Sequence, residues 1–334
     1  MKKNWISLLL AVLLVLALSA CGQTSGAPAQ TAEPEEINIA VLSGPTGMGM
    51  AKLMENSANG ETENAYRFAV STDPADVLAK VISGEYDIAA LPTNSAAAAY
   101  KKSEGAVRLL AINTYGTLYL LQNQAMESEA PAQISDLKGK TIAAFGQGAN
   151  PEYILDYVLT QNGLTVGEDV TVQFYATAEE VMTAAVAETA AYVMLPEPSA
   201  SVLRSKKDGM VTIFDLTSVW NDCADSPLVM GSLVVSAEFA EAYPEAVAAF
   251  LQEYAASVAY TQSNPAEAAA LIAEHGIVPN VAIAASALEF CNLICITGSD
   301  MQETVEGYYE ILFDYNPAAV GGAVPDEAFY YVAK

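Results

Sequence analysis

The chain has 334 residues and a formal net charge of −26, with 14 Lys and Arg against 40 Asp and Glu. So acidic a surface repels polyphosphates, and arginine occurs only at positions 67, 108 and 204, which argues against nucleic-acid binding. The single histidine, His275, leaves little for histidine-based catalysis, and without CxxC or HxxxH spacing neither a metal nor a cofactor is expected.

The first 36 residues have the composition of a targeting segment. Lys2 and Lys3 precede an apolar run, residues 5–18, that is too short to span a membrane comfortably. The run ends in Leu18-Ser19-Ala20-Cys21, which resembles a bacterial lipobox and implies cleavage before Cys21 and acylation of its sulfur. We therefore expect a signal peptide at 1–20 and a flexible, lipidated tether at 21–36. An ordinary signal peptide or a short membrane anchor is the alternative.

The domain after the tether opens with a strand, a turn and a helix. Residues 37–42 form a short β-branched apolar run, which predicts a buried parallel strand. The turn Ser43-Gly44-Pro45-Thr46-Gly47 follows, and the apolar spacing from Met48 to Met54 predicts a helix. Ligands bind at such strand ends in open α/β sheets, where the helix start presents free backbone N–H groups.

The chain repeats this plan further on. Residues 142–149 correspond to 39–46 at an offset of 103, and 170–176 correspond to 66–72 at an offset of 104. The offset of 104 also aligns 181–199 with 77–95. This near-constant register predicts two similar Rossmann-like lobes that face a shared cleft. The alternative is that any two segments of this type look alike because they share one period.

Further elements complete the two predicted lobes and a tail. In lobe 1 we expect strands over 66–70, 86–91 and 108–113, and helices over 75–83 and 96–102. Segments 118–121 and 228–236 predict two crossings between the lobes, which would form a two-stranded hinge, and 211–216 predicts another strand of lobe 2. Tail helices are expected over 244–263, 265–275, 281–293 and 301–313, packed on lobe 1. The expected division is lobe 1 at 37–117, lobe 2 at 118–232, and 233–334 for the return to lobe 1 and the C-terminal helices.

Four motifs resemble the solute-binding lipoproteins of ABC importers. They are the lipobox, the Gly44–Gly47 turn, the approach from Gly84 to Asn94, and the stretch DLKGKTIA at 136–143. The similarity covers 37–334 and is strongest to the nitrate, sulfonate, taurine and thiamine-precursor group, which has the type II periplasmic-binding-protein fold. It implies an α/β clamp that captures a small solute and delivers it to an ABC permease and its ATPase. It also implies an extracytoplasmic monomer held on the membrane by lipid.

Candidate ligand-binding residues follow from their positions at the predicted strand ends. The two glycine turns would expose N–H donors, and Glu197 suggests a donor-rich or cationic ligand. Threonine and asparagine there can cap a helix instead, and the aromatic residues can pack in the core instead of stacking on a ligand. The full set is Gly44, Pro45, Thr46, Gly47, Ser71, Thr72, Thr93, Asn94, Thr114 and Tyr115 in lobe 1, and Gly146, Gln147, Gly148, Tyr175, Glu197, Trp220 and Asn221 in lobe 2.

The chemistry of the solute and the rival functions stay open at this point. Scarce arginine and the acidic charge favour a neutral or cationic heterocycle, such as a vitamin precursor, although helix N-termini could hold a carboxylate or sulfonate. An enzyme could use Cys223 or Glu197, but GxGxxG, phosphate-loop and GxSxG motifs are missing. A sensor lipoprotein that reports to a receptor is a third possibility. Cys223, Cys291 and Cys295 would allow one disulfide and one free thiol.

Overall fold

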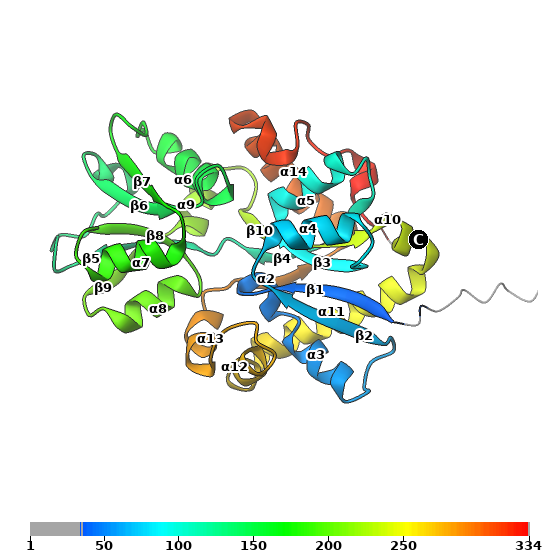
Figure 1. Ribbon diagram of the computed structural model, residues 1–334. Coiled ribbons are helices and arrows are strands. Elements are labelled where there is room, and N and C mark those ends of the chain that lie inside the picture. Colours follow the sequence, from blue (N-terminus) through cyan, green and yellow to red (C-terminus); the bar gives the residue numbers. More distant parts are fainter. Residues whose placement is uncertain (1–33, 35, 333–334) are drawn as a thin grey trace, which may run out of the picture. The chain divides into compact units, whose positions relative to one another are not determined.

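The computed structural model describes residue 34 and residues 36–332, and residues 34–334 form one compact unit. The predicted signal peptide, the acylation of Cys21 and nearly all of the tether lie outside the described residues. Two mixed β-sheets flanked by helices make up the described part, and we call the halves built on them lobe 1 and lobe 2 (Figure 1). Within this part, no helix combines the length and the apolar character needed to cross a membrane.

Lobe 1 is built on a six-stranded sheet in the order β11-β4-β10-β3-β1-β2. β1 pairs in parallel with β2 and β3, whereas β10 is antiparallel to both β3 and β4. Nearly all residues of β1 and β3 are buried, and for β1 the apolar run at 37–42 predicts this. The strands are β1 Ile37–Leu42, β2 Tyr66–Ser71, β3 Ile88–Pro92, β4 Val107–Tyr115, β10 Val229–Ser236 and β11 Leu293–Ile296.

The first helix of lobe 1 differs from the prediction. The chain forms one helical turn directly after Gly44, α2 Pro45–Met48, and then a separate helix, α3 Ala51–Ala58. Proline at the first helical position fits the helical φ, and Gly44 precedes it with a φ of 91° that favours glycine. α4 Pro74–Ile82 and α5 Thr93–Lys102 follow. α5 begins three residues before the predicted start, so Thr93 and Asn94 belong to its first turn.

Lobe 2 repeats this architecture on a five-stranded sheet in the order β7-β6-β8-β5-β9. Its strands are β5 Leu118–Asn123, β6 Thr141–Phe145, β7 Thr171–Tyr175, β8 Tyr192–Pro196 and β9 Met210–Asp215. Its helices are α6 Asn150–Gln161, α7 Ala178–Val186, α8 Ser199–Lys206 and α9 Leu216–Cys223, with a short 3-10 turn at Ile134–Leu137.

The two sheets confirm the internal repeat. The order β2-β1-β3-β10-β4 in lobe 1 matches β7-β6-β8-β5-β9 in lobe 2, and in each the fourth strand runs antiparallel to its neighbours. β3 and β8 begin and end at the predicted offset of 104. This fourth strand is β10 in lobe 1 and β5 in lobe 2. Each is reached by a crossing from the other lobe: β10 follows α9 of lobe 2, and β5 follows β4 of lobe 1. Two segments therefore connect the lobes, as predicted, but they are residues 116–117 and 224–228, and the segments expected to cross instead form β5 and most of β10 (Figure 1).

The tail is mostly helical, with one strand that the sequence analysis missed. α10 Ala237–Ala242, α11 Pro244–Ser263, α12 Pro265–Glu274, α13 Val281–Leu288 and α14 Gly298–Tyr315 agree with the predicted helical character. The helix expected over 281–293 stops at Leu288, because β11 adds to the edge of the lobe 1 sheet beside β4. α11 and α12 pack on α3, as expected, but α13 also contacts α8 and α14 contacts α6 in lobe 2. Short 3-10 turns at Pro317–Val320 and Glu327–Phe329 follow.

Candidate functional site

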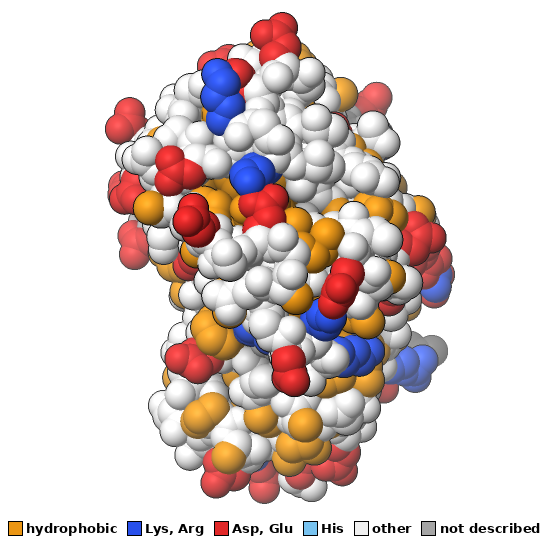
Figure 2. All heavy atoms as spheres, turned by 90° about the vertical axis from the view of Figure 1, so that its left-hand side faces the viewer, with side chains coloured by type: hydrophobic (Ala, Val, Ile, Leu, Met, Phe, Trp, Pro, Cys, Tyr) orange, Lys and Arg blue, Asp and Glu red, His pale blue; other side chains and the backbone are white. Residues whose placement is uncertain are grey.

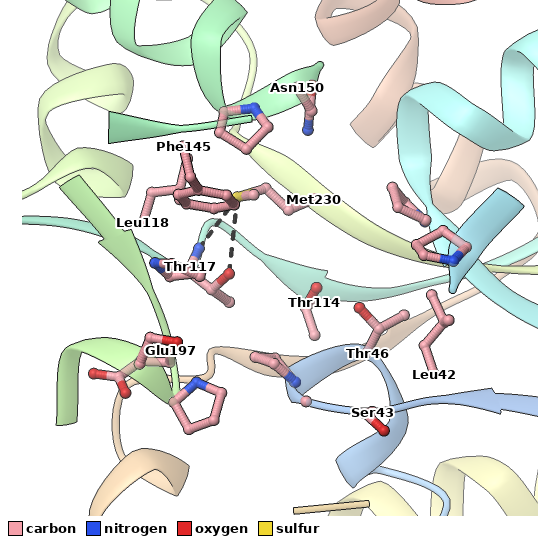
Figure 3. Close-up of a pocket in the computed structure, with 18 of the residues that line it drawn as sticks. Leu42, Ser43, Thr46, Thr114, Thr117, Leu118, Phe145, Asn150, Glu197 and Met230 are labelled. Carbon is pink, nitrogen blue, oxygen red and sulfur yellow. Dashed lines mark hydrogen bonds between the residues drawn. The ribbon is translucent and has the colours of Figure 1, made fainter. Parts of the chain in front are cut away.

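A cavity of about 930 Å³ lies between the two lobes, at the carboxyl ends of their parallel strands. Its walls come from the ends of β1, β3 and β4 in lobe 1, the ends of β6 and β8 in lobe 2, and the crossing segments between them (Figure 3). Leucine, isoleucine, valine, methionine, proline and phenylalanine side chains supply most of the lining. This is the strand edge at which the sequence predicts a ligand site.

The turn between β1 and α2 forms one wall of the cavity. Ser43, Gly44, Pro45 and Thr46 all line it. The turn is held from behind, where the side-chain amide of Asn113 donates to the backbone carbonyl of Thr46 at 2.8 Å. The turn is thus anchored to β4, and its exposed edge faces the cavity.

Two helices from opposite lobes begin at the cavity without a capping side chain. Pro92 precedes α5 and Ala149 precedes α6, and neither residue accepts a hydrogen bond from its helix through a side chain. Asn94 and Asn150, in the first turns of these helices, line the cavity. Each has one buried amide atom without a partner among the described residues, Oδ1 of Asn94 and Nδ2 of Asn150. Buried polar atoms are normally hydrogen-bonded, so both atoms are available to a bound molecule.

The crossing segments close one end of the cavity. The backbone N–H of Thr117 donates to Sδ of Met230 at 3.3 Å, and this contact joins the first crossing to β10, the strand that follows the second crossing (Figure 3). The side-chain amide of Asn292 donates to the carbonyl of Gly116 at 2.7 Å. These two hydrogen bonds therefore hold the crossing at 116–117 against β10 and against the tail.

Glu197 lines the cavity, but its carboxylate is engaged within lobe 2. Oε1 pairs with Nη2 of Arg204 at 3.0 Å, and Oε2 accepts from the backbone N–H of Ser201 at 3.2 Å. Figure 3 shows the carboxylate on the side of Glu197 that faces away from Thr114. Burial raises the pKa of Glu197 above its ordinary value, and the bonds to Ser201 and the charge of Arg204 oppose that rise. Its charge is therefore already compensated by the protein.

The structure brings six of the predicted site residues to the cavity, namely Gly44, Pro45, Thr46, Asn94, Thr114 and Glu197. Gly47 lies behind the turn against Leu42, and Thr93, the first residue of α5, is fully buried. Tyr115 lines a second cavity with Asn292, and Tyr175 lines a shallow pocket beside α7. The remaining predicted residues outside the cavity lining are Ser71, Thr72, Gly146, Gln147, Gly148, Trp220 and Asn221.

Trp220 is a core residue rather than a cavity residue. It is fully buried on α9, where its ring lies 4.4 Å from that of Tyr157 and 5.7 Å from that of Tyr308. Its indole N–H donates to the carbonyl of Ser226 at 2.8 Å. The indole is thus satisfied and enclosed, and the stacking role considered from the sequence does not fit this position. Asn221, its neighbour, is exposed on the helix surface.

Several cavity residues were missed by the sequence analysis. The cavity is lined by Phe145 and Asn150, on either side of the glycine turn at 146–148 that the sequence analysis nominated, and the turn residues themselves are outside the lining. Met230 is the second residue of β10, where a strand was expected but no residue at the cavity. The tail segment 277–279 and Ile283 also line the cavity, and no local pattern places a tail loop there.

The described residues carry no group of three or more His, Cys, Asp or Glu side chains arranged to hold a metal ion. Cys223, Cys291 and Cys295 are all free thiols, so the disulfide considered from the sequence does not form in this structure. None of the three thiols lines the cavity. Besides apolar and uncharged polar side chains, the lining contains the charged residues Asp73, Glu179, Glu197 and Lys206.

Solved structures share this architecture over nearly the whole chain. An ABC transporter from Parabacteroides distasonis is 24% identical with a TM-score of 0.76, covering 90% of this chain and 100% of that one. The periplasmic aliphatic sulphonate binding protein of Escherichia coli is 16% identical with a TM-score of 0.72, covering 90% and 94%. The ligand binding component of an ABC-type import system from Staphylococcus aureus, with zinc bound, is 12% identical with a TM-score of 0.67, covering 90% and 97%. A comparison with curated proteins gave no match.

The paired mixed sheets, the two crossings and these structural likenesses establish the type II periplasmic-binding-protein fold. The sequence itself matches one family model over residues 47–275, which is more than half of the chain. That match runs from the turn beside the cavity, through both crossings, to the end of α12. The chain therefore belongs to the NMT1-like family.

Proposed function

We propose that this protein is an extracytoplasmic solute-binding lipoprotein that captures a small molecule between its lobes and delivers it to the permease of an ABC importer. The observation that carries the proposal is the cavity of about 930 Å³ lined by strand ends and helix starts of both lobes. Ligand pockets of drug-sized molecules have this size and this mainly apolar lining. The likenesses to a sulphonate binding protein and to a component of an import system support it.

The proposal includes a place and a form for the protein. Residues 1–20 would be removed, Cys21 would carry the lipid, and the tether at 21–36 would hold a monomer on the membrane. Because β10 Val229–Ser236 lies in the lobe 1 sheet, lobe 1 would comprise 37–117 and 229–334, and lobe 2 would comprise 118–228 instead of ending at 232 as expected. On the face seen in Figure 2 acidic side chains are spread over the surface and basic ones are few, which suits a highly soluble exported domain.

For the solute we propose a neutral heterocycle with hydrogen-bonding groups at both ends. Asn94 Oδ1 in lobe 1 can accept a hydrogen bond and Asn150 Nδ2 in lobe 2 can donate one, and apolar side chains lie between them. Glu197, on which the cationic form of the heterocycle depended, is paired with Arg204, and the other charged residues of the lining, Asp73, Glu179 and Lys206, carry both signs. The ligand-binding residues that we propose are Gly44, Pro45, Thr46, Asn94, Thr114 and Asn150.

The two rival functions predict different observations. An enzyme on this fold would convert its bound compound, and a sensor lipoprotein would have a receptor or kinase gene as its neighbour. Import predicts neighbouring genes for an ATPase and a permease. The thiol of Cys223, one candidate nucleophile, lies outside the cavity lining. Native mass spectrometry of the protein from its own host, followed by incubation of the released compound, distinguishes capture from turnover.

We expect one compound from a panel of small metabolites to stabilise the pure protein against heat. A ligand at a hundred times its Kd that binds only the native state adds about 2.7 kcal/mol to the free energy of unfolding. For a domain of this size that corresponds to a rise of about 5 °C in Tm. Differential scanning fluorimetry measures it, and a broad panel without any shift would contradict the proposed function.

Two matched variants test where that compound binds. Asn94→Leu removes a cavity acceptor and should weaken binding about tenfold, since a ligand donor then loses its partner. Asn221→Leu makes the same chemical change on the exposed surface of α9 and should leave the Kd unchanged. Titration calorimetry gives both values. Weaker binding in the Asn221 variant alone would show that the solute site lies elsewhere.

A further inference from the structure

Asn150 is a buried donor at the lobe 2 wall of the cavity. It is the first residue of α6 and only 4% exposed, and its Nδ2 has no partner among the described residues. Figure 3 shows the amide nitrogen pointing from the α6 side toward Thr114, across the cavity. A buried amide that keeps its donor unpaired in this direction is suited to a molecule that supplies the acceptor.

The side chain that decides which way this amide faces comes from the tail. Tyr308, on α14, donates its hydroxyl to Oδ1 of Asn150 at 2.7 Å. The tyrosine is fully buried and its ring packs against Trp220 at 5.7 Å and Tyr309 at 6.1 Å, so its hydroxyl has one fixed position. Burial raises the pKa of Tyr308 well above its ordinary value, so the hydroxyl keeps the proton that it donates. Because Oδ1 is held by Tyr308, Nδ2 is the atom left to face the cavity.

The start of α6 favours the same kind of ligand group. The helix has twelve residues, and its N-cap, Ala149, offers no capping side chain. An uncapped helix N-terminus carries a partial positive charge and attracts electron-rich groups. Glu152, in the first turn of α6, offsets part of this charge and accepts from the backbone N–H of Gly148, so the oriented amide contributes more than the helix start to the preference for an acceptor atom at this end of the cavity.

We propose that Tyr308 is a positioning residue that sets the specificity of the lobe 2 end of the site, where it turns Asn150 so that this end takes a hydrogen-bond acceptor of the solute. The inference rests on the proposed function and narrows its substrate class. A carbonyl oxygen, a ring nitrogen or a carboxylate fits this end, and a group that only donates does not. Loss of the tyrosine hydroxyl would free the amide to rotate and present Oδ1 instead.

Three probes of one shape test this: benzoate, benzamide and benzamidine. Their planar heads accept only, accept and donate, or donate only. For the parent protein we expect benzamide to bind more tightly than benzamidine by ligand-detected NMR titration. In Tyr308→Phe the ratio of the two dissociation constants should shift toward benzamidine by about three- to tenfold, the size expected for one oriented hydrogen bond. A merely structural role of Tyr308 would weaken both probes alike and leave the ratio unchanged. Benzoate shows whether a charged acceptor binds better than the neutral one.

Two further variants keep the test decisive. Tyr309→Phe removes the hydroxyl of an equally buried neighbour, which is bonded to the carbonyl of Thr93 at 3.0 Å, and should not change the ratio. Asn150→Asp replaces the donor by acceptors and should weaken benzoate more than tenfold relative to benzamidine. An unchanged ratio in Tyr308→Phe, or a solute found by the panel that offers only donors to Asn150, would overturn the inference but not the proposed function. If no small molecule binds at all, both fail.

Discussion

Replacement of Gly47 by alanine should lower the free energy of unfolding by about 3 kcal/mol or more, because a side chain there would overlap the backbone. A Cβ atom at this position would lie 1.9 Å from the carbonyl oxygen of Leu42 and 2.8 Å from Cγ1 of Val41. Val41 is fully buried in β1, so neither the strand nor α2 can move apart without opening the core. Urea denaturation followed by circular dichroism measures the loss.

The same change should disturb the site. α2 would have to shift, and with it Pro45 and Thr46, which line the cavity. We therefore expect the ligand-dependent rise in Tm to be lost as well. Gly84→Ala is the control, since Gly84 has a φ of 77° with open space around it, so the variant should lose only about 1–2 kcal/mol from backbone strain and keep its ligand response. Equal losses in the two variants would contradict the steric argument.

Much of this fold could be predicted because its signals are local. The apolar run at 37–42 and the proline that begins α11 each specify an element from a few adjacent residues, and the offset of 104 transfers such local signals from one lobe to the other. β11 could not be predicted in this way. Its four residues, Leu293–Ile296, are stabilised by pairing with β4 from far along the chain, and the preceding helical period masks them.

The candidate site was predictable in position but not in its side chains. The strand-end rule places Gly44, Thr46 and Thr114 at the cavity, because a parallel sheet has all of these ends on one edge. The rule does not say which way a side chain turns. Asn150 depends on Tyr308, which is 158 residues away in the sequence, and no local pattern relates the two. Trp220 follows a strand end and yet packs inward.

The structure gives Glu197 surroundings that change its expected role from binding the solute to holding the fold together. The sequence places a carboxylate at the cleft, and the structure surrounds that carboxylate with donors from its own lobe. Arg204 also donates to Oγ of Ser201 at 2.8 Å and to Oγ1 of Thr212 at 2.8 Å, and its guanidinium lies 4.8 Å from the ring of Phe290. These contacts fix α8 against β9 and the tail segment after α13. The pair therefore acts as a structural link at the cavity wall.

Removal of Arg204 should reveal this structural role through its pH dependence. Arg204→Met leaves the fully buried carboxylate of Glu197 without its counter-charge, and at pH 7 we expect a loss of about 2–3 kcal/mol, below the range for fully buried pairs because Arg204 is partly exposed. The variant also removes one of the effects that oppose the raised pKa of Glu197, so that pKa should rise further. A carboxyl whose pKa is higher in the folded than in the unfolded state favours the folded state at low pH, and this contribution is lost as the pH rises through the folded pKa.

The deficit of Arg204→Met should therefore be smaller at pH 5 than at pH 7, because the raised pKa makes the folded carboxyl take up its proton before the unfolded one as the pH falls. Lys207→Met is the matched control, because it removes a cation three residues further along, whose partner Glu188 is 52% exposed, and it should cost less than about 1 kcal/mol at both pH values. Urea denaturation of both variants at pH 7 and pH 5 makes the comparison. A deficit that is absent, or equal at the two pH values, would mean that Glu197 does not need Arg204, and the carboxylate would again be a candidate partner for a cationic solute.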